Sequence, residues 1–355
     1  MYEEETYEDI LDRMLDRVDD SFDKREGSVI YDALAPAAAE HAIMYMELQS
    51  TLNRISVDTA TGEDLDMKCK ERSIYRKSAT NAVMKGVFTP SSLEIPLNSR
   101  FTCDGIGYFV SKKISAGVYQ MTCETSGAAR NASFGSLIPV DYIDGLETAE
   151  LTELLIPGED TETDDDLRDR YNNSFESKAY GGNKADYRDK TNSINGVGAV
   201  KITPVWDGGG TVKLTILNSS YDKASETLIE TVQNIIDPNQ DGKGVGIAPI
   251  GHIVTIDTPT ELSINVSTTL TFDAGYSFEP LKEDIENAVR DYLLELRKHW
   301  ADEGVETIVR LSQIESKIMS VDGTIDISGT TLNGTAANIT CSEYEIPVFG
   351  GVENG

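Results

Sequence analysis

The side chains best suited to catalysis or metal binding, histidine and cysteine, are few and widely spaced. His41, His252 and His299 fall on three separate predicted elements, so neither a metal cage nor a nucleophile relay is indicated. The four cysteines show no C-x-x-C spacing, which argues against a zinc ribbon or a redox motif. We expect reduced, buried thiols, and a disulfide between Cys103 and Cys123 stays open if neighbouring strands bring them together.

Two acidic motifs are candidate cation sites. The segment DPNQDG at 237–242 begins like a calcium-binding loop, with oxygen donors at positions one, three and five and glycine at six. Ala248 stands at position twelve, where such a loop has a bidentate Glu, so we favour a turn that ends a helix and leave ion binding open. The run of three aspartates at 164–166 is the pattern of a carboxylate cluster, but we interpret it as the solvated start of a helix.

Glycine-rich segments provide flexibility and no phosphate site. Residues 208–210 (GGG) and 242–246 (GKGVG) lack the spacing and the following Lys-Ser/Thr of a phosphate-binding loop, so we expect turns. Paired glycines also occur at 181–182. As a hypothesis, rigid domains pivot at these joints. The hinge candidates are Gly181, Gly182, Gly208, Gly209 and Gly210.

Size and charge restrict the class of protein. A chain of 355 residues suggests about two or three domains. The 61 Asp and Glu against 31 Lys and Arg leave a net charge of −30, which repels nucleic acid and anionic lipid. No apolar stretch approaches the ~20 residues of a membrane span, and the acidic start MYEEE does not resemble a secretory leader. We expect synthesis and folding in the cytosol, without a signal peptide.

Residues 1–75 are predicted to form a helical arm. An amphipathic helix comes first, and an alanine-rich helix follows over residues 28–55. Thr61 and Asp64 fit a capping box that starts a helix reaching about Arg72. The arm lacks a third layer, so its apolar stripe packs either on this chain's own body or on another subunit. The interface candidates are Leu11, Leu15, Val18, Phe22, Ile30 and Leu34.

The remainder is predicted to be an α+β multidomain chain. Period-two alternation with Gly and Pro turns favours a small antiparallel β domain over residues 76–156. A helical connector at 157–195 follows, and then two small α+β domains with mixed sheets at 196–258 and 259–355. We expect their helices at 225–236, at 278–300 and from Ser312, which forms a capping box with Glu315.

Short motifs follow one another along residues 60–259. The first are TGEDLD at 61–66 with Arg72 and Arg76, IP at 95–96, GY at 107–108 and GAARN at 127–131. The clearest block is GEDTE at 158–162, DDLR at 165–168, Arg170, GG at 181–182, DY at 186–187, Gly196, Val197 and Val200. Val205, GGTV at 209–212, Val245 and AP at 248–249 extend it, and EIP at 345–347 and FG at 349–350 match loosely. In this order the motifs resemble the baseplate J-like proteins of contractile phages, defective prophages and R-type tail-like bacteriocins.

The resemblance implies a structural subunit of a baseplate wedge, with no catalysis, metal or cofactor. The implied partners are further copies of the chain, other wedge proteins, the hub and spike, and sheath-initiating and tail-fibre proteins. Such a ring holds the sheath extended until receptor contact changes the wedge. Two alternatives remain: an enzyme, for which the sequence gives no reason for two acids to converge, and an extracellular adhesin or calcium-binding module, which needs a secretion route.

Overall fold

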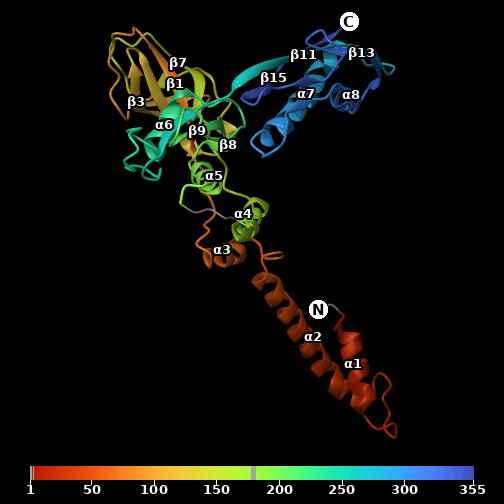
Figure 1. The fold of residues 1–355 in the computed structure, drawn as a ribbon. Coiled ribbons are helices and arrows are strands. Elements are labelled where there is room, and N and C mark those ends of the chain that lie inside the picture. The colour runs from red at the N-terminus through yellow and green to blue at the C-terminus, as the bar shows by residue number, and fades with distance from the viewer. Residues whose placement is uncertain (1, 3, 177–180) are drawn as a thin grey trace. The chain divides into compact units, whose positions relative to one another are not determined.

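The computed structural model describes residues 2, 4–176 and 181–355 and divides the chain into two compact units. Unit 1 comprises Met1–Ser78 and Thr161–Ser177, and unit 2 comprises Ala79–Asp160 and Lys178–Gly355. Helices and several sheets alternate within this α+β multidomain chain, as the sequence predicts (Figure 1).

The arm in unit 1 is a long helix with a shorter one beside it. α1 (Tyr7–Asp16) packs along the first half of α2 (Val29–Ile55), where the hydroxyl of Ser28 accepts from the N–H of Tyr31 and caps the helix (Figure 1). The interface candidates Val18 and Phe22, which helical periodicity places on one stripe with Leu11 and Leu15, lie beyond the end of α1. The chain turns after Asp16, and the carboxylate of Asp19 accepts from the N–H of Ser21, a local bond that competes with helix.

Two short helices complete unit 1. α3 (Gly62–Lys70) and α4 (Asp164–Glu176) pack around Ala60, Leu65, Cys69 and Leu167, all of which are buried. Thr61 is the N-cap of α3 as predicted, but its hydroxyl makes no capping bond, so the capping box is wrong in its chemistry. Asp64 instead accepts from Arg54 Nε at 2.8 Å.

The first part of unit 2 is a seven-stranded antiparallel sheet. The order is β5-β7-β1-β4-β3-β2-β6, with bounds β1 Asn81–Thr89, β2 Arg100–Cys103, β3 Ile106–Ser115, β4 Val118–Ser126, β5 Gly135–Ser136, β6 Ile138–Pro139 and β7 Thr148–Ile156. A 3-10 turn, Ala128–Arg130, precedes β5. Because β5 and β6 are consecutive yet pair with opposite edges, the sheet closes on itself. The interior is apolar and includes Met84, Phe88, Phe101, Tyr108, Tyr119 and Met121.

A three-stranded mixed sheet forms the middle of unit 2. β9 (Thr211–Asn218) pairs antiparallel with β8 (Val197–Pro204) and parallel with β10 (Ile253–Asp257). α5 (Lys184–Asn192) packs on β8, and α6 (Glu226–Ile236) packs on β10. The mixed sheet and the helix capped by Ser225 are confirmed.

The C-terminal part of unit 2 has a second mixed sheet. β11 (Thr260–Phe272) pairs antiparallel with β13 (Thr324–Leu332) and parallel with β15 (Glu345–Asn354), while β12 (Ile308–Val309) pairs with β14 (Ile339–Thr340). α7 (Phe278–Lys298) and α8 (Leu311–Met319) cover this sheet. The predicted cap at Ser312 is wrong, because α8 begins at Leu311 with Arg310 as its N-cap.

Candidate assembly site

The motifs TGEDLD, Arg76 and GEDTE meet in a charged network at the base of the arm. Arg76 donates from Nε to Asp66 at 2.7 Å, from Nη2 to Asp164 at 2.6 Å and from Nη1 to the Glu162 carbonyl at 2.7 Å. The other oxygen of Asp164 accepts from the N–H of Gly62 at 3.0 Å. Residues about a hundred positions apart are therefore held together by one guanidinium, whose side chain is only 16% exposed.

Two further arginines of α4 tie it to the segments flanking α3. Arg170 pairs with Glu162 and donates to the Tyr75 carbonyl at 2.7 Å. Arg168 donates to the carbonyls of Val57 and Ala60 at 2.9 and 3.0 Å. Each arginine donates to backbone carbonyls that lie outside helices and strands. These charged residues therefore connect separate segments of the chain.

The network changes the acidity of its members. Hydrogen bonds from the Gly62 N–H and from Arg76 hold the pKa of Asp164 below its usual range. The hydrogen bond to Asp66 raises the pKa of Arg76. The interpretation of 164–166 as a merely solvated helix start is therefore wrong for Asp164, although Asp165 and Asp166 fit it, with Asp166 donating its N–H to the Thr163 hydroxyl.

A second set of motif residues meets in unit 2. The Asn131 side chain donates to the Gly158 carbonyl at 3.0 Å and accepts from the Gly158 N–H at 2.7 Å. Glu159 accepts from the N–H of Gly196 at 2.8 Å, and Asp160 accepts from the N–H of Ala128 at 3.0 Å.

Glycine is needed at two of these positions for steric reasons. A Cβ on Gly158 would lie 2.8 Å from the backbone N of Ala82. One on Gly196, whose φ is +88°, would lie 2.8 Å from a methyl of Ile156. The motif residues thus serve the fold of each unit.

Exposed apolar side chains gather on the second half of α2. Met44, Leu48, Leu52 and Ile55 follow one another at helical spacing and are between 40% and 60% exposed. α2 has 27 residues and α1 has 10, so α2 is about 40 Å long and α1 about 15 Å. α1 therefore cannot cover the whole length of α2.

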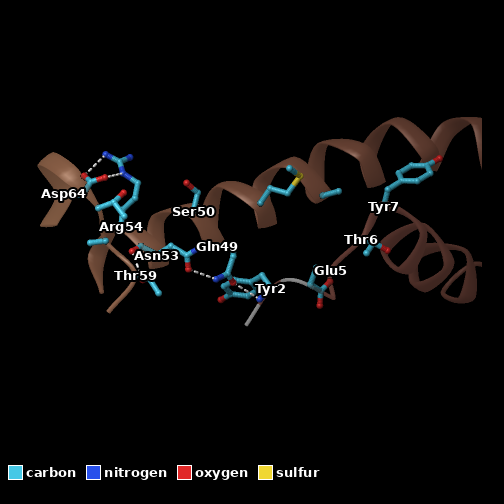
Figure 2. A pocket seen from close by; sticks show the side chains of 14 residues that line it. Tyr2, Glu5, Thr6, Tyr7, Gln49, Ser50, Asn53, Arg54, Thr59 and Asp64 are labelled. Carbon is cyan, nitrogen blue, oxygen red and sulfur yellow. Dashed lines mark hydrogen bonds and ion pairs between the residues drawn. The ribbon is translucent and has the colours of Figure 1, made fainter. Parts of the chain in front are cut away.

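A groove of about 720 Å³ runs beside the same half of α2. Figure 2 shows Gln49, Asn53 and Arg54 of α2 along the groove and Tyr2 close to Gln49, whose side-chain oxygen accepts from the Tyr2 N–H at 3.0 Å. Asp64 lies at the end where it pairs with Arg54. The lining combines apolar, amide, hydroxyl and charged side chains.

The interface candidates from the sequence have different surroundings. Leu11 is buried, and it clusters with Leu15, Leu34 and Ala38 inside the arm. For these residues the chain itself supplies the packing partner. Val18 and Ile30 are half-buried, and Phe22 is 57% exposed. Their role in assembly stays a prediction.

The hinge candidates also separate into two groups. Gly208, Gly209 and Gly210 form the tip of the hairpin between the paired strands β8 and β9, so movement there would displace a loop and not a domain. Gly181 and Gly182 have φ of +60° and +86° and follow residues 177–180, which lie outside the described residues. Hinge motion at either place stays a prediction.

The calcium-like loop carries structural hydrogen bonds. Asp237 is buried and accepts from the N–H groups of Gln240 and Val254, at 3.1 and 3.0 Å. Asp241 pairs with Lys243. Among residues 2, 4–176 and 181–355, no three His, Cys, Asp or Glu side chains are grouped as a metal would need. Nor does a helix of that part of the chain combine the length and hydrophobicity that crossing a membrane requires.

The histidines and cysteines are dispersed in the structure as well. His252 shares a 2.8 Å hydrogen bond with the hydroxyl of Tyr187, and burial raises the pKa of Tyr187 to about 12. His299 contacts Asp302 on the surface. All four cysteines are buried and free, and Cys103 and Cys123 lie on β2 and β4, which are separated by β3.

Comparison with known proteins identifies the family. Residues 179–258 match the Baseplate J-like central domain, and residues 264–355 match the Baseplate J-like protein C-terminal domain. The chain is 41% identical to the uncharacterized protein YqbT and 40% identical to the phage-like element PBSX protein XkdT, both of Bacillus subtilis (strain 168). Each alignment covers 99% of this chain and 98% of the relative.

More distant similarities extend to a phage and to a solved assembly. Baseplate protein gp47 of Escherichia phage Mu is 28% identical over 228 residues, which cover 60% of this chain and 62% of gp47. The cryo-EM structure of the anti-feeding prophage baseplate contains a chain that aligns with a TM-score of 0.43 at 8% identity, over 96% of this chain and 90% of that one.

The two domain matches and the full-length relatives define a structural protein of the baseplate of a phage-like tail or tail-like particle. The chain belongs to the baseplate J-like family.

Proposed function

We propose that the chain is a wedge subunit of the baseplate, that it associates with itself and with other wedge proteins around a hub and spike, and that it relays the trigger for sheath contraction. Sheath-initiating and tail-fibre proteins are further partners in this proposal. The supporting observation is the arm, whose α2 exposes Met44, Leu48, Leu52 and Ile55. A helix that exposes such a stripe gains stability by burying it against another helix.

The proposal assigns no catalytic activity to the chain. XkdT, which aligns over 99% of the chain, is a phage-like element protein, and gp47 is a baseplate protein. The strong negative charge, −30 over the chain, opposes nucleic acid as a partner. The proposed place of action is the assembled particle, after synthesis in the host cytoplasm.

The arm is tested by placing charge on its exposed face. We expect the double variant Leu48→Asp/Leu52→Asp, made in the full chain and produced with the rest of its gene cluster, to be lost from purified particles. Burying two carboxylates in a helical interface would cost several kcal/mol. The matched control is Glu47→Lys, which changes charge at an exposed position of the same helix. Normal incorporation of a folded double variant would contradict the use of this face.

The proposed relay of the contraction trigger is tested at Gly181, the first of the paired glycines at 181–182. We expect Gly181→Pro to slow triggered contraction, because φ is fixed near −65° in proline and stands at +60° at this position. Gly304→Pro is the control, since Gly304 also has a positive φ and open space around it. Equal contraction rates in both variants would remove Gly181 from the relay.

A further inference from the structure

The closed β-sheet of unit 2 carries an apolar stripe on its outer surface. Along the segment that contains β5 and β6, Leu137 points into the core, and the even-numbered residues on either side point outward. These outward side chains are largely apolar and strongly exposed: Phe134 at 48%, Ile138 at 66%, Val140 at 55% and Tyr142 at 86%. We name these four residues the β-domain stripe.

The segment that carries the stripe is hydrogen-bonded to β2, where it closes the sheet. Ile138 pairs with Thr102 of β2, and the N–H of Val140 donates to the Arg100 carbonyl at 2.9 Å. These contacts hold the backbone at Ile138 and Val140 against β2, so this part of the stripe loses little backbone freedom when it is covered.

A recess lies beside the stripe. It has a volume of about 390 Å³, and Pro139, Tyr142, Ile143 and Leu146 form its apolar side. Glu147 and Glu150 also line it. A recess of this size accepts one large side chain of a partner, which is how central contacts of protein interfaces are commonly built.

The charge around the stripe favours a partner with a basic surface. Residues 131–150 contain four carboxylates, Asp141, Asp144, Glu147 and Glu150, and no Lys or Arg. Arg100, whose carbonyl accepts from the Val140 N–H, has its guanidinium paired with Glu124 at 2.6 Å. A second copy of this surface would bring like charges together, whereas a basic rim would match it.

We propose that the β-domain stripe docks another protein subunit of the particle, one that inserts an apolar side chain into the recess and surrounds it with Lys and Arg. This proposal rests on the proposed function for the particle, but it uses a surface separate from the arm. A basic rim would also make the contact weaken as salt concentration rises.

The test uses the buried state of the native cysteines. Because all four are buried, a Tyr142→Cys variant presents one accessible thiol for a maleimide, and Lys112→Cys on the outer part of β3 is the control. We expect residue 142 to react at least about tenfold more slowly in assembled particles than in the free chain, because interface cores exclude water. Residue 112 should react equally in both. If the variant does not assemble, hydroxyl-radical footprinting of Tyr142 in the unaltered chain measures the same change in exposure between the free chain and the particle.

A photo-crosslinker at position 142 then identifies the occupant. The expected crosslink is to a Lys- or Arg-rich surface of a different subunit. A crosslink to this chain's own sequence would replace the proposal with self-association, and full reactivity in particles that contain the chain would overturn the stripe as an interface. Particles that form without the chain would instead contradict the proposed function.

Discussion

Arg76 and Asp164 lie 88 positions apart in sequence, and Arg76 Nη2 is 2.6 Å from Asp164 Oδ1. The same guanidinium also holds Asp66, so one side chain joins α3 to the start of α4. Helices this short are marginal in isolation. The base of the arm therefore owes its form to a few specific contacts, which single substitutions can test.

Arg76→Ala should destabilise unit 1 by about 1–3 kcal/mol, because two carboxylates and a carbonyl lose a charged donor. Urea unfolding combined with hydrogen exchange of α3 and α4 measures the change. Arg25→Ala is the matched control, since Arg25 pairs with Asp23 but is 87% exposed, and its removal should leave stability nearly unchanged. Equal effects of the two substitutions would show that the network is not structural.

The stability of this network should depend on pH. The pKa of Asp164 is lowered in the folded state, so the folded chain binds fewer protons there than the unfolded chain does. The stabilisation is therefore present above the ordinary pKa of about 4 and is lost as pH falls through the folded pKa. Hydrogen exchange of α3 and α4 should accelerate in this acidic window, and less so in Asp164→Asn. An identical pH profile for both proteins would refute the assignment.

Leu65→Ala should cost about 2–4 kcal/mol in unit 1, because Leu65 is fully buried between α3 and α4 and its truncation leaves a cavity. Met67 lies on the same helix and is 62% exposed, so Met67→Ala should change stability by no more than about 0.5 kcal/mol. Chemical denaturation of both variants measures the difference. A small effect of Leu65→Ala would mean that α3 and α4 do not pack as described.

Asp237→Asn should destabilise unit 2 by about 1–3 kcal/mol. Its two oxygens accept from two different N–H groups, and an amide would place a donor against one of them. Asp241→Asn serves as control, because it removes the charge paired with Lys243 while the amide oxygen can still accept from the Lys243 N–H. Added calcium should leave the thermal midpoint unchanged. A calcium-dependent rise in that midpoint, abolished by Asp237→Asn, would instead establish an ion site.

The sequence predicted most elements, because each has a local signal. Alternation marks the strands of the closed sheet, and Ser28 and Ser225 mark helix starts where their hydroxyls accept from the backbone. Where the local signal was misleading, a competing contact is visible. Asp19 accepts from the N–H of Ser21 just beyond the end of the first helix. Asp64 accepts from Arg54 and does not cap α3.

The base of the arm was less predictable. The motifs containing Arg76 and Glu162 carry the family resemblance, but an ion pair between segments this far apart leaves no periodic pattern in the sequence. Closure of the sheet was hidden for a related reason, since Ile138 and Ser136 belong to strands of two residues each. The exposure of Leu48 and Leu52 could not be known before the short length and position of α1 were known.

The central claim is tested most directly by negative-stain electron microscopy of particles made from the native gene cluster with and without this chain. Deletion should abolish sheathed tails or leave tails that lack a baseplate, and restoring the chain should rescue them. Normal particles that still contract in the absence of the chain would contradict its role as a baseplate subunit.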